Sequence, residues 1–226
     1  MLNGKPIKIN ALTSEQTDRM YSIMQKYYDN IKKENFISDL FEKEDAILLC
    51  DENGDIYGFT TLAIFFHNKN TQLLYSGDTI VEKEYWGRND LSEAWIKNAM
   101  NYADNFDGKT YWLLLTKGYK TYKFLHTFFV EFYPRVETKI PAEIQAIIDT
   151  FGAKHFGEKY QNGVFIEGKD FLKKDFDTIS ESNMRNKNTA FFIEKNPGYY
   201  KGDELVCITE LSEENLNRLG RKMLGV

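Results

Sequence analysis

The hydrophobic pattern at the start of the chain predicts one strand followed by two helices. Residues 6–12 alternate between apolar and polar side chains, as in a short strand. Thr13-Ser14-Glu15-Gln16 then forms a capping signal, because the Thr side chain can accept from a first-turn amide while Gln16 reaches back. Met20 and Met24 belong to the apolar stripe of the helix that follows, and a second helical piece is expected at 36–41.

The next segment carries the clearest hairpin in the chain. Apolar arms at 46–50 and 56–62 flank Asn53-Gly54, and both of these residues tolerate the positive φ that tight hairpin turns demand. The second arm continues toward Phe66, and a polar turn leads into a further strand at Gln72. Three antiparallel strands are therefore expected here.

Two strand-to-helix units follow between residues 72 and 135. A strand at 73–81 leads through a Gly-containing turn into a helix that begins near Leu91. A second strand, 111–116, leads through a basic turn into an aromatic helix that we expect to end at Pro134. Such units in series predict α/β architecture, with chemistry expected where strands end and helices begin.

After Pro134 the pattern predicts a helix, two closing strands and a final helix. The helix begins within 140–143 with Pro141 in its first turn, the strands are expected at 163–166 and 204–209, and the last helix is expected at 212–224. A polar insertion separates the two strands, and it is either a lid over a substrate groove or a long connection.

Composition narrows the function classes. A net charge of −5 argues against a broad nucleic-acid surface, and no apolar run approaches the roughly 20 residues that a membrane span needs. Because the N-terminus also lacks a signal-peptide segment, a cytoplasmic location is expected. Cys50 and Cys207 lie in apolar runs and are expected to be buried free thiols, and their spacing predicts no metal site.

The element order of residues 5–135 resembles the GNAT acyltransferase superfamily. Ile56-Tyr57-Gly58-Phe59 looks like the third strand of that family, and Thr79-Ile80-Val81 followed by Trp86-Gly87-Arg88 looks like its fourth strand and coenzyme loop. The resemblance implies an α/β fold with a mixed, mostly antiparallel central sheet flanked by helices. We expect one domain over 1–226, with its core at 5–135 and a C-terminal extension at 136–226.

The same resemblance implies acyl-CoA or acetyl-CoA as co-substrate. In that family the donor lies between the fourth and fifth strands, here contacting Thr79, Ile80 and Val81, with its pyrophosphate on the amides of the next helix. Gly87 and Arg88 suit a phosphate loop, because a helix start offers N–H groups and partial positive charge.

The rest of this loop departs from the family pattern. Trp86, Asn89 and Leu91 stand where Arg or Gln and small residues are usual, and 90–93 reads as a capping box that would occupy the same amides. The alternative is that Gly87 is a plain turn residue and Arg88 a solvated charge.

Three residues are candidates for acid–base chemistry. Gly77 inside an apolar strand indicates a bulge, and the neighbouring Asp78 could take a proton from the acceptor, or could instead pair with a Lys or with backbone amides. The resemblance implies a helical Tyr that protonates the leaving thiolate. Tyr122 and His126 compete for this role, although each could equally be structural.

A basic turn precedes the aromatic helix. Lys117, Lys120 and Lys123 cluster at a helix start, where the helix dipole disfavours cations, so an anion held there would relieve the conflict. That anion could be the phosphate of CoA or an acidic acyl carrier protein. A solvated basic face is the alternative.

These patterns predict an acyltransferase that moves an acyl group from acyl-CoA or an acyl carrier protein to an amine or hydroxyl of a small-molecule acceptor. The alternative is a catalytically silent GNAT-like module that binds a ligand or partner in the same place. The acyl length, the acceptor and the oligomeric state are not encoded in any pattern we recognise.

Overall fold

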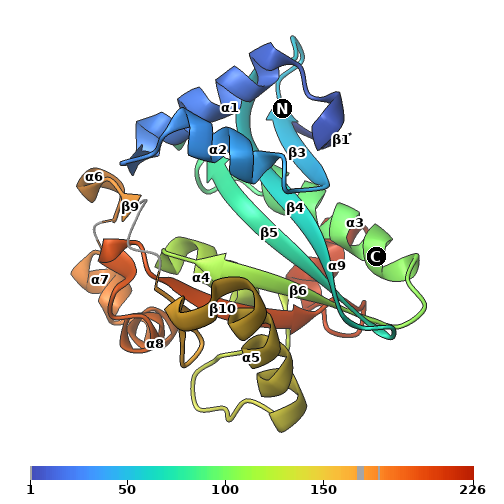
Figure 1. The fold of residues 1–226 in the computed structure, drawn as a ribbon, viewed down its shortest axis with the longest axis vertical. Coiled ribbons are helices and arrows are strands. Elements are labelled where there is room, and N and C mark those ends of the chain that lie inside the picture. The colour runs from blue at the N-terminus through green and yellow to red at the C-terminus, as the bar shows by residue number, and fades with distance from the viewer. Residues whose placement is uncertain (1, 167–170, 178) are drawn as a thin grey trace.

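The computed structural model describes residues 2–166, 171–177 and 179–226, and it is built on one large twisted sheet (Figure 1). In this sheet β5 and β6 are parallel and the remaining pairs are antiparallel. In spatial order its strands are β1 (Asn3–Lys8), β3 (Asp45–Cys50), β4 (Ile56–Asn68), β5 (Thr71–Val81), β6 (Lys109–Thr116), β10 (Glu204–Glu210), β8 (Val164–Phe165) and β7 (Tyr160–Gln161). The short strands β2 (Tyr28–Asp29) and β9 (Phe171–Leu172) form a separate antiparallel pair.

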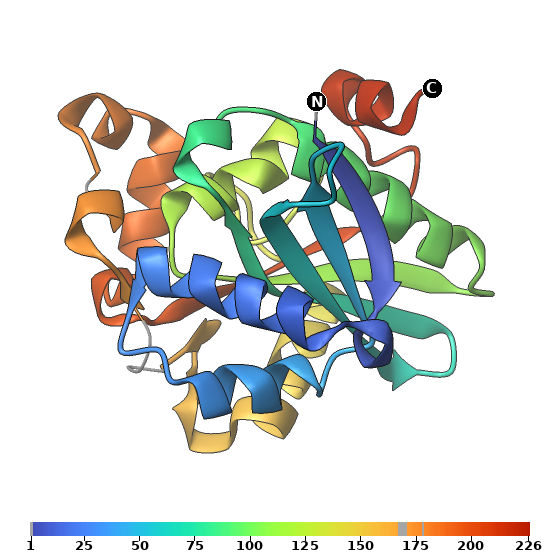
Figure 2. The same cartoon turned by 90° about the horizontal axis from the view of Figure 1, so that it is seen from above.

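Helices cover both faces of the sheet; Figure 2 shows α1 and α2 in blue in front of it and α3 in green behind. The helices are α1 (Ser14–Tyr27), α2 (Lys33–Leu40), α3 (Asp90–Asp104), α4 (Tyr119–Phe128), α5 (Ala142–Phe156), α6 (Lys174–Asp177), α7 (Glu181–Met184), α8 (Lys187–Lys195) and α9 (Arg218–Leu224). The fold is thus mixed α/β with a mostly antiparallel central sheet, as the sequence predicted.

The period of two along β6 divides the core between these faces. Trp112 and Leu114 pack on the face covered by α3, α4, α8 and α9, whereas Leu113 and Leu115 pack with α5 on the other face. The helices α1 and α2 cover β3 and β4 on that second face, with Phe59 fully buried. Burying both faces of a strand produces the near-continuous apolar run 111–115 that the sequence shows.

Several local predictions are confirmed. Thr13 and Gln16 form a reciprocal capping box at the start of α1. The hairpin of β3 and β4 is present, with Gly54 at φ 91°. Helix α5 and the closing strands β8 and β10 lie where the pattern predicted them. Cys50 and Cys207 are buried free thiols.

Three element boundaries were wrong. The predicted strand 6–12 is β1 (Asn3–Lys8) followed by a 3-10 turn at Ile9–Ala11. The last helix is short, because Asn217 rather than Ser212 caps it. The aromatic helix ends at Phe128 and does not reach Pro134, since the chain beyond it pairs instead with the C-terminal segment, through bridges Phe129–Leu216 and Tyr133–Ile208.

The segment beyond Pro134 contributes to the same sheet. β10 pairs with β6 along Leu205–Thr116 to Glu210–Tyr111, and β8 and β7 extend the sheet further. The extension therefore completes the central sheet, and its α5 and α8 cover opposite faces of it.

Candidate functional site

The two parallel strands at the centre of the sheet separate before they end. β5 and β6 pair from Thr71–Lys109 to Ser76–Leu114, and beyond that point β5 continues to Val81 beside β4 while β6 continues beside β10 (Figure 1). Ser76 closes the last pair, with its hydroxyl accepting a buried hydrogen bond of 2.9 Å from Trp112 Nε1. Beyond Ser76, the backbone of β5 is therefore not paired with β6.

A β-bulge marks the point of separation. Thr60 pairs with Thr79 and Leu62 with Ser76, so Gly77 and Asp78 together oppose the single residue Thr61. A Cβ on Gly77 would lie 2.5 Å from Thr61 Oγ1, so only glycine fits this close approach. The bulge that the sequence predicted at Gly77 is confirmed.

The bulge also reverses the side-chain alternation of β5. Before the bulge, odd-numbered residues such as Leu73 pack on the sheet face that α5 covers. After the bulge, the even-numbered Ile80 packs on that face, and the odd-numbered Val81 packs on the opposite face, which α3 and α4 cover. Asp78 is partly buried at the bulge itself. Its role as a base stays a prediction.

Backbone directions after the bulge follow from the ladder with β4. The amide of Glu82 donates to the Tyr57 carbonyl at 2.8 Å, and in an antiparallel strand the polar groups alternate between neighbours. Ile80 and Glu82 therefore point toward β4, whereas Thr79 and Val81 point to the side from which β6 has separated. Of the predicted donor contacts, Thr79 and Val81 offer backbone groups there and Ile80 does not.

The loop after β5 is a 3-10 turn, Lys83–Tyr85, followed by Trp86 and by Gly87 at φ 83°. Arg88 is not a free charge, because its guanidinium binds the Asp90 carboxylate through Nε at 2.6 Å and Nη2 at 3.2 Å. The predicted capping box at 90–93 is wrong: Asn89 is the N-cap of α3 and makes no side-chain cap bond. Asp90 cannot cap because it holds Arg88.

Trp86 joins this loop to the neighbouring helix. Its indole donates to the Val81 carbonyl at 2.7 Å, and Lys120 of α4 lies over the ring at 4.2 Å. The Phe176 ring of α6 packs against Trp86 from the C-terminal extension, with the ring centroids 5.7 Å apart. The turn before α3 and the first turn of α4 therefore meet at Trp86, beside the open side of β5.

Tyr122 and His126 lie one turn apart on α4 but in different surroundings. Tyr122 is 1% exposed, and its hydroxyl donates to the Pro134 carbonyl at 2.9 Å. Burial raises the pKa of Tyr122 far above its ordinary value. His126 is partly buried, and burial, then the nearby Lys123 charge, lowers its pKa. This geometry favours a packing role for Tyr122 and leaves the partly exposed His126 as the alternative candidate for the proton donor.

The three lysines before and within α4 do not share one environment. Lys117 has 16% of its side chain exposed and pairs with Glu204 at 3.8 Å. This ion pair links the segment before α4 to β10. Lys120 and Lys123 are exposed, and only Lys120 is directed to Trp86. An exposed docking face would therefore consist of Lys120 and Lys123.

Sequence reasoning missed Glu82, which ends β5 and is 7% exposed. Its carboxylate accepts from Arg19 at 3.1 Å, Lys26 at 2.5 Å and the Tyr27 hydroxyl at 2.8 Å. Burial favours the neutral acid, but the hydrogen bonds from Lys26 and Tyr27 outweigh it, so the pKa of Glu82 is lowered. Burial first, and then the Glu82 bond, raise the pKa of Tyr27 to about 12.

A signal for Glu82 was nevertheless present. Arg19, Lys26 and Tyr27 recur at a spacing of seven and eight residues on α1, so they lie on one helix face. The Tyr27 hydroxyl also accepts from the Lys83 amide at 2.6 Å, which fixes the start of the loop that carries Gly87.

Two further findings concern the described residues. Among them, no group of three or more His, Cys, Asp or Glu side chains could hold a metal ion. Nor do they include a helix long and apolar enough to cross a membrane.

The sequence matches no protein-family model, and the search of curated proteins finds no relative. Among solved structures the chain is similar to GCN5 from Tetrahymena, at 12% identity and a TM-score of 0.47 over 71% of this chain and 91% of that one. It is also similar to the "IAA acetyltransferase" of Bacillus cereus, at 10% identity and a TM-score of 0.43 over 93% of this chain and 99% of that one. A third similar structure is the CoA complex of the GNAT family N-acetyltransferase YhbS from Escherichia coli, at 12% identity and a TM-score of 0.40 over 55% of this chain and 68% of that one.

These similarities are at the level of the fold. The described elements follow the order that the sequence resemblance implied, which is a strand, two helices, a three-stranded meander, a helix, a strand and a helix, and the parallel central strands separate at a bulge.

Proposed function

We propose that the protein transfers an acyl group from a CoA thioester to an amine or hydroxyl of a small acceptor. One observation carries the proposal: β5 leaves β6 after Ser76, and Thr79 and Val81 then direct backbone groups into the separation. An extended thioester arm can pair with such an edge as a further strand would. The same N–H groups can polarise the thioester carbonyl during attack.

The chain's own residues supply a base beside this edge. Asp78 lies on the bulge, one residue before Thr79, and it would take the proton of the attacking amine or hydroxyl. The acceptor then forms a bond to the acyl carbon, the carbon–sulfur bond breaks, and the thiolate leaves with a proton. His126 is the better donor of that proton, since the Tyr122 hydroxyl is held by the Pro134 carbonyl.

The donor's phosphates would lie where α3 and α4 begin. Asn89 leaves the first amides of α3 without a side-chain cap, and Lys120 adds a cation at Trp86 nearby. The carboxylates of Asp90 and Glu93 in the first turn of α3 repel an anion, so they offset part of the attraction that the positive end of the helix dipole exerts on it. Lys120 is thus expected to contribute much of the phosphate affinity.

Native mass spectrometry with a panel of acyl-CoAs, followed by turnover with amines, tests the proposal. Acyl-CoA should bind and Lys120→Gln should weaken it by roughly tenfold, while binding of the matching acyl-pantetheine, which lacks the nucleotide, should change little. Lys97→Gln, an exposed lysine on α3 paired with Glu93, is the matched control. Wild-type protein that binds neither compound would exclude this donor.

A silent binding module with the same fold is the second candidate, and the burial of Tyr122 favours it. If the tyrosine only packs, no proton donor matches the expected helical Tyr. Tyr122→Phe separates the cases, since loss of turnover with retained melting temperature would make it an acid. A module would bind acyl-CoA and turn over no acceptor in any variant, wild type included.

A further inference from the structure

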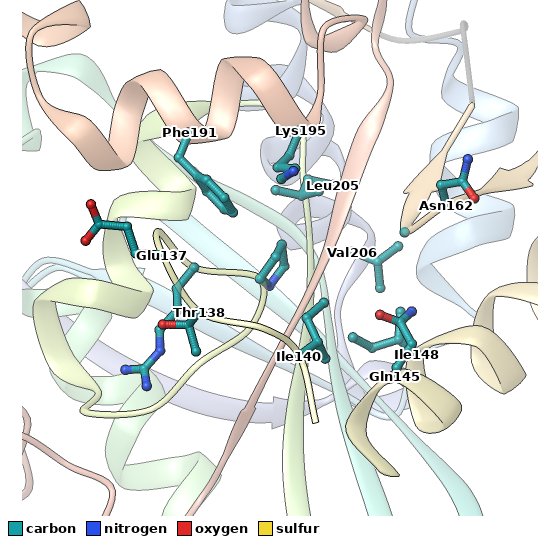
Figure 3. Close-up of a pocket in the computed structure, with 13 residues that line it drawn as sticks. Glu137, Thr138, Ile140, Gln145, Ile148, Asn162, Phe191, Lys195, Leu205 and Val206 are labelled. Carbon is teal, nitrogen blue, oxygen red and sulfur yellow. The ribbon is translucent and has the colours of Figure 1, made fainter. Parts of the chain in front are cut away.

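A cavity of about 310 Å³ lies at the outer edge of β10, away from the β5–β6 site (Figure 3). β10 has two partners along this edge: β8 pairs with Glu204 and Leu205, and Tyr133 bridges to Ile208. Val206 lies between these partners and lines the cavity. The Val206 amide donates to the Gly163 carbonyl at 2.8 Å, so the cavity lies beside a paired strand edge, with α5 and α8 at its sides.

Apolar side chains form most of its wall. Phe191 of α8 and Ile140 of the loop before α5 lie on opposite sides of it (Figure 3). The other apolar lining residues are Pro134, Ile148, Leu205 and Val206. A volume at the lower end of the usual range for ligand pockets, about 300 to 1,000 Å³, suits a single ring or a short alkyl chain.

One buried donor in this wall lacks an acceptor. Arg135 lines the cavity, and its Nη1 donates to the Val130 carbonyl at 2.9 Å. Its Nε is buried and has no hydrogen-bond partner among the described residues. Because Nε is buried, a ligand reaches the guanidinium through its remaining N–H groups, and a carboxylate there accepts a charge-assisted hydrogen bond.

The remaining charges favour an anion as well. Lys195 of α8 lies at the rim, where its ammonium is 3.1 Å from the exposed Glu194 carboxylate and 5.4 Å from the Phe191 ring centroid. Glu137 is directed away from the cavity in Figure 3, is 81% exposed in its side chain, and pairs with Lys187 at 3.8 Å. Arg135 in the wall and Lys195 at the rim therefore meet no inward carboxylate among the described lining residues.

We propose that this cavity binds a small monocarboxylate with an apolar body, such as an arylacetate. The carboxylate lies on the Arg135 guanidinium, and the body lies between Phe191, Ile140 and Val206. The site is distinct from the acyl-transfer site, because β10 is two strand spacings, about 10 Å, from β5. All of its lining residues except Pro134 and Arg135 come from the C-terminal extension.

Calorimetry with phenylacetate as the probe tests this site in the full-length protein. Saturable binding with a dissociation constant on the order of 1 mM or tighter is expected for a ligand of this size. Phenylacetamide, which keeps the shape and loses the charge, should bind roughly tenfold more weakly or worse. Acyl-CoA should leave phenylacetate binding unchanged, because the two sites are separate.

Variants assign the contact. Arg135→Gln should weaken phenylacetate by roughly tenfold, and Lys195→Gln, at the exposed rim, by a smaller factor of about two to five. Arg218→Gln, an exposed arginine on α9, should change nothing. Melting curves establish whether each variant is folded. If Arg135→Gln is not folded, the affinity of Lys195→Gln for phenylacetate alone tests the proposal. Absence of saturable binding to wild type, equal affinity for the amide, or unchanged affinity in the folded variants overturns the proposal.

Discussion

At the scale of single residues, Glu82, which directly follows β5, is a buried carboxylate that accepts from three side chains. Its lowered pKa means that the carboxylate stabilises the folded state. That contribution is fully present above the ordinary glutamate value of about 4.5 and is lost as the pH falls through the lower folded pKa. The residue therefore holds α1 to the start of the loop that carries Gly87 at neutral pH, and this attachment is lost in acid.

We expect Glu82→Gln to lower the free energy of unfolding by about 1 to 3 kcal/mol at pH 7, because Arg19, Lys26 and Tyr27 lose a charged acceptor. Urea unfolding at pH 7 and at pH 3.5 or below measures this. The difference from wild type should shrink at the lower pH. Glu84→Gln, on an exposed neighbour, is the control, and a difference that stays constant with pH would contradict the role assigned to Glu82.

Asp78 allows a sharper test of chemistry. As the base, Asp78→Asn should keep the melting temperature and reduce acyl transfer by a factor on the order of 100 or more. As a structural acid at the bulge, the same change should destabilise by about 1 to 3 kcal/mol, with activity falling only in step with folding. Melting and turnover are measured on one preparation. An early-melting variant with normal turnover below its midpoint ends the catalytic role.

Residues whose conformation is set by their neighbours could be predicted from the sequence. Gly77 and Gly54 are such cases, since a bulge and a tight turn each require a residue without a side chain. The helix face that carries Arg19, Lys26 and Tyr27 is visible in the spacing of α1, but its pairing with Glu82 could not be predicted, because these residues precede Glu82 by 55 to 63 residues and only the fold brings them together. The burial of the Tyr122 hydroxyl depends likewise on the return of Pro134 over α4.

At the scale of elements, the hairpin and the start of α1 were predicted well, whereas the end of α4 and the start of α9 were wrong. The hairpin and the cap of α1 are encoded within a few residues. The end of α4 is decided elsewhere: the Val130 amide donates to the Asn215 carbonyl, and the Glu131 amide donates to the Asn215 side chain at 2.8 Å. The hydrophobic periodicity of residues 119–134 does not indicate that Asn215 is their partner.

The extension places α6 against the candidate donor site, and this contact makes an element-scale prediction. Phe176 packs on Trp86, which is 38% exposed, while Trp95 and Trp112 are nearly fully buried. Acrylamide quenching of tryptophan fluorescence therefore reports mainly on Trp86. Phe176→Ala should raise the quenching constant by about twofold, because one face of the indole loses its cover. Phe41→Ala, an exposed phenylalanine after α2, should leave it unchanged, and equal quenching in both variants would contradict the contact.

At the scale of the whole molecule, the net charge of −5 makes local basic patches the places where an acidic partner can dock. If the donor is an acidic acyl carrier protein, changing Lys120 and Lys123 together to Glu should weaken its binding at least about tenfold, and added salt should weaken the wild-type complex. Lys117 is left intact, since its loss would break the pair with Glu204. Lys32 and Lys69 to Glu serve as the control pair, and binding that survives both salt and charge reversal excludes this surface.

The position of β10 has a consequence for synthesis of the chain. β6 pairs with β10 along six residues, from Thr116 to Tyr111, yet 87 residues separate the end of one from the start of the other. A nascent chain that has emerged only as far as α8 presents Trp112 to Leu115 on an open sheet edge, an apolar template for wrong pairing with another chain. Folding on the ribosome therefore waits for the last strand, and a stalled or clipped chain without residues 204–210 should aggregate rather than remain soluble.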